Sequence, residues 1–166
     1  MMRGPVPTPL RLTEVIPRNA IRFPLESASP DGALAELTRV LVESGRLPRE
    51  LEENALIGLL KREALGPTGI GHGIAVPHTR VAGLKAICGA LGVSSEGVAF
   101  RSPDQSLVHA VFLFLAPERD HAGYLQLLAL VSRIVQEGGF VPSACEAGTS
   151  ARLATLLREF EAKILG

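Results

Sequence analysis

The feature that most constrains the fold is an apolar run from Leu107 to Ala116, interrupted only by His109. The run has the length of a long strand and is far too short for a membrane-spanning helix. A strand that is apolar on both faces normally lies inside a sheet that helices cover on both sides. The run therefore predicts an α/β fold built around a central strand.

Helical periodicity surrounds this run. Apolar residues recur at helical spacing over 31–43, where Asp31 is expected as the N-cap, and again from about Pro48 to Gly66. A third helix is predicted over 121–137, apolar on most of its circumference and therefore largely buried. A fourth is expected to follow an N-cap at Thr149 or Ser150.

Shorter segments read as strands at residues 19–25, 74–76 and 86–93. Together with the helices they predict a three-layer α/β sandwich, a mixed β-sheet flanked by helices on both faces. Residues 1–11 are proline-rich and are expected to form a flexible N-terminal segment. Residues 12–166 are then predicted to form a single domain.

Charge and cysteine content narrow the classes of function. The 17 basic and 17 acidic residues are scattered along the chain, which argues against a nucleic-acid partner or direct membrane insertion. The N-terminus lacks the apolar core of a signal peptide, so we expect a cytoplasmic protein. Cys88 and Cys145 are too few and too far apart to predict a disulfide scaffold or a zinc site.

The most informative segment is KREALGPTGIGHGIAVPHTR, residues 61–80. Its glycines suggest close backbone approach, and its short apolar run places His78 just past a predicted strand. Side chains at that position in α/β sheets commonly line a ligand crevice. The segment lacks both the P-loop ending and the strand-before-helix context of a dinucleotide site, so nucleotide binding is disfavoured.

The residues from Glu63 through Gly71 and the run Ile74 to His78 resemble the active-site motif of enzyme IIA of the bacterial phosphotransferase system, fructose/mannitol class. The resemblance covers about residues 10–163 and is nearest to the nitrogen-regulatory branch. It implies that His78 is phosphorylated at Nε2 by the phosphocarrier protein HPr or a relative. It also implies that Arg62, which precedes His78 by sixteen residues, stabilises the phosphoryl group.

By this resemblance the chain is a component of a phosphotransferase rather than a stand-alone enzyme, and it needs no metal or other cofactor. Its second partner would be an EIIB domain or a regulated protein such as a kinase or transporter. A regulatory role is favoured because no EIIB or membrane segment accompanies the domain and the usual second histidine is absent. Sugar transport, with phosphoryl transfer to an EIIB domain, remains the alternative. The sequence leaves open the sugar, the regulated partner and the oligomeric state.

Two departures from the family's pattern concern the same site. Thr79 takes the place of the small residue that commonly follows the active histidine, and Tyr124 takes the place of a second histidine. His121 could be a displaced equivalent, the Tyr124 hydroxyl could bind the phosphate, or the second role is missing. A helix starting near Asp120 would put His121 and Tyr124 on one face toward His78.

The chemistry itself asks for a neutral imidazole and for donors to the phosphoryl oxygens. A hydrogen bond from Nδ1–H of His78 to a carbonyl would keep Nε2 nucleophilic. Free N–H groups at the helix start near His121, and the hydroxyls of Thr68 and Thr79, are candidate donors. A metal-dependent hydrolase using the four histidines is a weaker hypothesis, because they form no compact ligand motif. His109 is expected to be a satisfied core or edge histidine, and His72 a rim residue.

Overall fold

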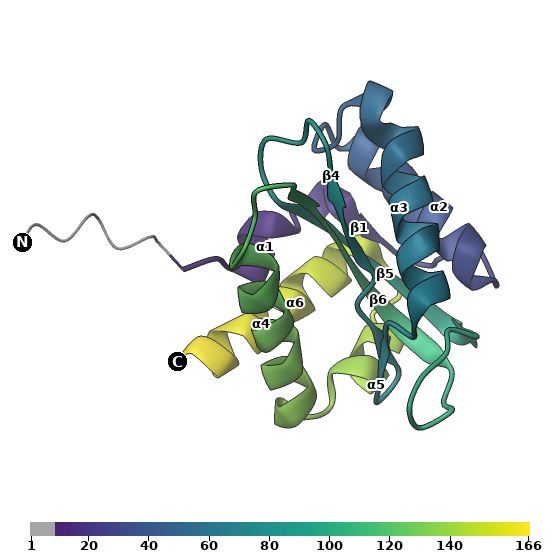
Figure 1. The fold of residues 1–166 in the computed structure, drawn as a ribbon. Coiled ribbons are helices and arrows are strands. Elements are labelled where there is room, and N and C mark those ends of the chain that lie inside the picture. Colours follow the sequence, from purple (N-terminus) through teal and green to yellow (C-terminus); the bar gives the residue numbers. More distant parts are fainter. Residues whose placement is uncertain (1–8) are drawn as a thin grey trace, which may run out of the picture.

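A computed structural model describes residues 9–166, and its centre is a six-stranded mixed sheet (Figure 1). The long strands β5 (Cys88–Val98) and β6 (Val108–Pro117) pair antiparallel in the middle. The strand β1 (Ile21–Arg22) runs parallel to β5 on one side. On the other side, β3 (Ile74–Ala75) and β4 (His78–Val81) run parallel to β6, and β2 (Gly69–Gly71) pairs antiparallel with β3.

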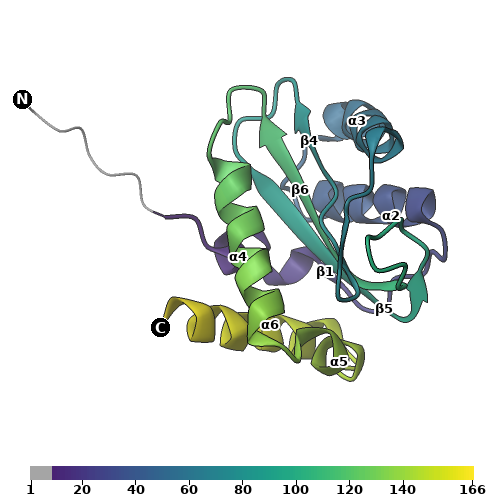
Figure 2. The same cartoon turned by 60° about the horizontal axis from the view of Figure 1, so that its bottom comes forward.

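Helices cover both faces of this sheet, which confirms the predicted three-layer α/β sandwich. Figure 2 shows α2 (Pro30–Glu43) and α3 (Glu52–Leu65) on one side, and α4 (Gly123–Glu137), α5 (Phe140–Cys145) and α6 (Ser150–Leu165) on the other. A short helix, α1 (Leu12–Val15), packs against α6. Single 3-10 turns precede β1 (η1, Arg18–Ala20) and α3 (η2, Arg49–Leu51).

The core is built on β6, whose residues 110–115 are completely buried, as the apolar run predicts. The ring of Phe112 packs against Phe140 at 5.7 Å between centroids, and Phe140 meets Phe160 edge-on at 5.3 Å. These contacts fasten α5 and α6 to the sheet. Burial of β6 between two helical layers fixes the position of its carboxyl end, beside which β4 begins with His78.

Several element boundaries differ from the sequence-based expectations. Ser29, not Asp31, caps α2, because its hydroxyl accepts from the Gly32 N–H. Thr149 does cap α6, accepting from Arg152 N–H. The third long helix begins at Gly123 and buries one face only, since Leu125 is 61% exposed.

The N-terminal region is described only from residue 9 onward. The predicted flexible segment therefore falls mainly on residues 1–8, outside the described residues. From Leu12 onward the chain is tied to α6 by Glu161, a carboxylate that is only 4% exposed. Its oxygens accept hydrogen bonds from the backbone N–H groups of Leu12 and Thr13 and from the Thr13 hydroxyl. Within residues 9–166, no helix has the length and apolarity needed to cross a bilayer.

Candidate functional site

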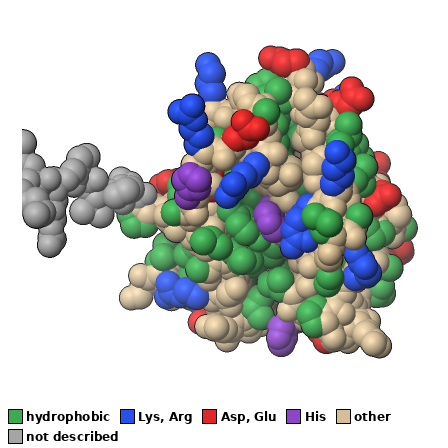
Figure 3. Space-filling view, viewed as in Figure 1, with side chains coloured by type: hydrophobic (Ala, Val, Ile, Leu, Met, Phe, Trp, Pro, Cys, Tyr) green, Lys and Arg blue, Asp and Glu red, His purple; other side chains and the backbone are tan. Residues whose placement is uncertain are grey.

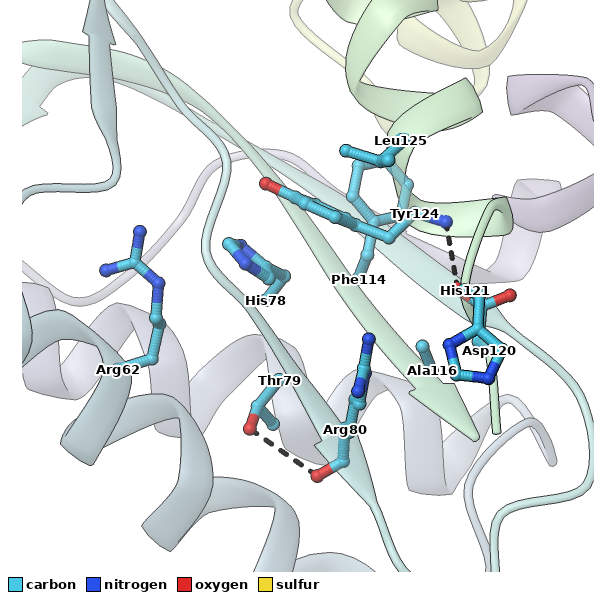
Figure 4. A pocket seen from close by; sticks show the side chains of 10 residues that line it. All are labelled: Arg62, His78, Thr79, Arg80, Phe114, Ala116, Asp120, His121, Tyr124 and Leu125. Atoms are coloured by element: carbon cyan, nitrogen blue, oxygen red, sulfur yellow. Dashed lines mark hydrogen bonds between the residues drawn. The ribbon is translucent and has the colours of Figure 1, made fainter. Parts of the chain in front are cut away.

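A cavity of about 510 Å³ lies where β4, the carboxyl end of β6, α3 and the start of α4 meet (Figure 4). Two of its walls come from strands and two from helix ends, so segments far apart in the sequence share it. Its lining residues are Arg62, His78, Thr79, Arg80, Phe114, Ala116, Asp120, His121, Tyr124 and Leu125. Five of the predicted site residues are thus brought together, and Thr68 is not among them.

His78 is the first residue of β4 and directly follows Pro77. Its Nδ1 lies 3.2 Å from the carbonyl oxygen of Val76. A carbonyl can only accept, so Nδ1 carries the proton and Nε2 presents a lone pair. The structure thereby identifies the carbonyl that the sequence could not, and it leaves the lone pair of the neutral ring on Nε2.

The ring of Tyr124 is stacked on that of His78, with centroids 3.8 Å apart and planes inclined by 19°. Both residues are half-buried, so one face of the imidazole is closed to water. Burial lowers the pKa of His78, and the Arg62 charge lowers it further, while the bond to Val76 raises it. The net direction is downward, which keeps the imidazole neutral and nucleophilic near neutral pH.

This lowered pKa gives a pH dependence with a definite sign. We expect His78 to titrate below 6.5 in the folded protein, as followed by NMR of its imidazole C–H signals. Because the unfolded chain binds this proton first, the His78 contribution to stability falls as pH drops from about 6.5 through the folded pKa. Tyr124→Leu, which uncovers the ring, should move the midpoint back toward 6.5. A wild-type midpoint at or above 6.5 would contradict the assignment.

Two arginines flank His78. Arg62, in the last turn of α3, donates from one Nη to the carbonyl of Gly66 at 3.0 Å. Part of its guanidinium group therefore satisfies a backbone carbonyl at the end of the helix. Burial raises the pKa of Tyr124, and the Arg62 charge opposes that rise, as it adds to the burial that lowers the pKa of His78. Arg80 was not singled out in the sequence. It stands two residues after His78 on β4, and period-two alternation puts both side chains on one side of the strand.

The start of α4 differs from the expectation in a way that matters for anions. The Asp120 carboxylate accepts from the N–H groups of Gly123 and Tyr124, both at 3.1 Å. Two of the N–H groups expected to be free for phosphate oxygens are therefore occupied. His121 precedes the helix, so it does not share a helical face with Tyr124. It is exposed, although it still lines the cavity.

The two threonines have different surroundings. Thr79 lines the cavity, but its side chain faces α3, where a Cβ on Gly58 would come within 2.7 Å of the Thr79 hydroxyl oxygen. The bulkier residue is thus accommodated by a glycine on the neighbouring helix. Thr68 is buried, and its hydroxyl donates to Glu63 at 2.5 Å. It lies outside the cavity, so its position does not support a role as a phosphate donor.

The other two histidines lie elsewhere. His109 is part-buried on β6 with its Nδ1 2.9 Å from the Ser94 carbonyl, which confirms the prediction of a satisfied strand histidine. His72 occupies the β2–β3 turn with a φ of 58° and lines a separate cavity. No group of three or more metal-ligating side chains is found within residues 9–166.

The surface of the protein also groups its charged side chains. Figure 3 shows histidine and basic side chains next to one another beside an apolar area of the surface.

Comparison with known proteins gives a consistent assignment. A family model described as "Phosphoenolpyruvate-dependent sugar phosphotransferase system, EIIA 2" matches residues 14–160. A nitrogen regulatory protein of Bradyrhizobium diazoefficiens is 33% identical over 76% of this chain and 80% of its own length. The fructose-specific EIIABC component of Bacillus subtilis is 28% identical over 92% of this chain, which spans only 24% of that relative.

Solved structures agree on the fold. The crystal structure of the nitrogen regulatory protein IIA-Ntr from Neisseria meningitidis superposes with a TM-score of 0.71 at 27% identity, covering 88% of this chain and 98% of that one. The enzyme IIA of the Escherichia coli mannitol system, solved in complex with phosphorylated enzyme IIB, superposes with a TM-score of 0.69. At 20% identity, over 86% of this chain and 96% of that one, the latter likeness concerns the fold alone.

Proposed function

The chain belongs to the EIIA 2 family of the phosphoenolpyruvate-dependent sugar phosphotransferase system, and from this premise we propose that His78 is the residue that carries the phosphoryl group. One observation carries the proposal. The Nδ1–H of His78 is held by the Val76 carbonyl, which leaves Nε2 as a free nucleophile in a cavity flanked by Arg62 and Arg80. No other described histidine combines a fixed tautomer with two neighbouring cations.

The transfer step needs little from the protein beyond position and charge. The lone pair of Nε2 forms a bond to phosphorus while the bond from phosphorus to the donor nitrogen breaks, and the donor ring keeps that electron pair. The proton on Nδ1 stays in its bond to Val76, so the phosphorylated ring of His78 is cationic. The stacked face of Tyr124 favours such a ring, and the arginines neutralise the phosphoryl oxygens.

A phosphorylated HPr-type carrier is the donor we propose, and two classes of onward partner have support. Relatives include nitrogen regulatory proteins and fructose-specific EIIA components, so homology alone favours neither. We favour regulation because Tyr124 covers one face of the His78 ring at the position where the family usually has a second histidine. Sugar transport with an EIIB domain remains the second candidate, supported by the matches to fructose-specific components.

Onward transfer separates these two functions. The protein is phosphorylated with phosphoenolpyruvate, enzyme I and an HPr-type carrier, and a fructose-class EIIB domain is then added. We expect one phosphoryl group on the wild-type protein and slow transfer to EIIB. Tyr124→His, which supplies the missing imidazole, should accelerate this transfer on the order of tenfold.

Tyr124→Phe is the matched control, because it keeps the stacked ring and removes only the hydroxyl. It should transfer as slowly as the wild type. Rapid transfer from the wild type to EIIB, with no gain in Tyr124→His, would favour the transport function. Failure of the wild type to accept any phosphoryl group would contradict the proposed function as a whole.

A further inference from the structure

We propose that Arg80 is the principal cation that binds the phosphoryl group on His78, ahead of Arg62. This inference rests on the proposed function and deepens it, since it concerns how the same site holds its charge. It follows from what each neighbouring donor of the cavity already binds. A phosphoryl group on Nε2 brings up to two negative charges into a half-buried site, so its oxygens need donors that are not otherwise engaged.

The first two N–H groups of α4 are not available as such donors. A helix N-terminus ordinarily attracts anions through its first N–H groups. Here the N–H groups of Gly123 and Tyr124 both point to the Asp120 carboxylate, at 3.1 Å each. A phosphoryl group at this position would have to displace a carboxylate and would meet its negative charge. Side-chain cations must therefore bind and neutralise most of the phosphoryl oxygens.

Arg62 is only partly available for this role. One of its Nη groups donates to the Gly66 carbonyl at 3.0 Å, which satisfies a carbonyl at the end of α3. A full bidentate contact with phosphoryl oxygens through that edge of the fork would leave this carbonyl without its donor. The Gly66 carbonyl and the phosphoryl oxygens compete for one guanidinium, so Arg62 has fewer N–H donors free for the anion.

Arg80 is not under such a constraint. It lines the cavity, lies on the same side of β4 as His78, and is exposed. The two salt bridges found within residues 9–166 join Arg22 to Glu36 and Arg39 to Glu52, so Arg80 forms no salt bridge in this part of the chain, although Asp120 lines the same cavity. Figure 4 shows its side chain extending into the cavity on the side of His78 away from Arg62. Its guanidinium is therefore free to make a bidentate contact with a phosphoryl group on the His78 ring.

The test compares Arg80→Ala with Arg62→Ala, using phosphoenolpyruvate, enzyme I and an HPr-type carrier as the phosphorylating system. We expect the initial rate of phosphorylation to fall about 100-fold in Arg80→Ala and about tenfold in Arg62→Ala. Arg80→Lys should recover only part of the rate, because an ammonium cannot form the bidentate contact. Arg158→Ala removes an exposed arginine of α6 that does not line the cavity, and it should behave as the wild type.

A second measurement separates binding of the phosphoryl group from docking of the donor protein. The ³¹P NMR signal of the isolated phosphoprotein is titrated with pH for each variant. Loss of a cation at the phosphoryl oxygens raises the pKa of that group, so Arg80→Ala should titrate at higher pH than the wild type, and by more than Arg62→Ala. A role confined to donor docking leaves this titration unchanged.

The outcomes are distinguishable. A labelled wild type with an unchanged ³¹P titration in Arg80→Ala would overturn the inference, whether or not the rate falls. A larger effect in Arg62→Ala than in Arg80→Ala on both measurements would also overturn it. In each of these cases the proposed carrier function stands, whereas absence of labelling in the wild type would overturn both.

Discussion

His78→Gln is expected to take up no phosphoryl group under conditions in which the wild-type protein becomes fully phosphorylated. Glutamine retains an N–H donor that can reach the Val76 carbonyl, so the local structure of β4 should survive. It has no nitrogen lone pair able to attack phosphorus, because the amide nitrogen is delocalised into its carbonyl. The measurement is incorporation of labelled phosphate from phosphoenolpyruvate through enzyme I and an HPr-type carrier.

A matched control is available in His72→Gln. His72 lies in the β2–β3 turn and lines a different cavity, so the same substitution there should leave incorporation unchanged. The folded state of both variants is checked by thermal unfolding. Incorporation into His78→Gln at the wild-type level would place the acceptor on another residue and would remove the basis of the proposed function.

Glu161→Ala is expected to reduce the stability of the protein strongly while leaving the site untouched. The buried carboxylate accepts from Leu12 N–H, Thr13 N–H and the Thr13 hydroxyl, and alanine leaves these donors without an acceptor. Unsatisfied buried donors are costly, so we expect a loss of about 3 kcal/mol in the free energy of unfolding. For a chain of this size that corresponds to a fall in melting temperature on the order of 10 °C.

Glu159→Ala provides the control for Glu161→Ala, because it removes an exposed carboxylate from the same helix, α6. It should change the free energy of unfolding by less than about 0.5 kcal/mol. Urea unfolding followed by circular dichroism measures both variants. Equal stability of the two variants would show that the bonds from Glu161 to α1 contribute little, and α1 would then be held by its apolar residues alone.

The arrangement of layers could be predicted because it follows from hydrophobic periodicity. The apolar run of β6 required cover on both faces, and the amphipathic helices α2, α3 and α6 supplied it. The elements that were missed carry little periodic signal. The strand β4, with sequence HTRV, is short and mostly polar, and α5 has only six residues.

The site was predicted in part, and the missing parts depend on tertiary contacts. His78 and Arg62 followed from the resemblance to a family motif, but stacking of Tyr124 on His78 joins β4 to α4 and leaves no periodic trace. Arg80 would have been found by period-two alternation had β4 been recognised as a strand. Asp120 makes the hydrogen bonds of a helix cap, yet the helix begins only at Gly123, so the expected face shared by His121 and Tyr124 does not form.

The central claim is that Nε2 of His78 carries the phosphoryl group while Nδ1–H remains bound to Val76. NMR of the phosphorylated, ¹⁵N-labelled protein tests it most directly, because coupling between ³¹P and the imidazole nitrogens identifies the bonded atom. The account predicts one phosphoryl group per chain, bonded to Nε2 of His78, with a proton on Nδ1. A phosphoryl group on Nδ1 of His78, or on His72, His109 or His121, would contradict it.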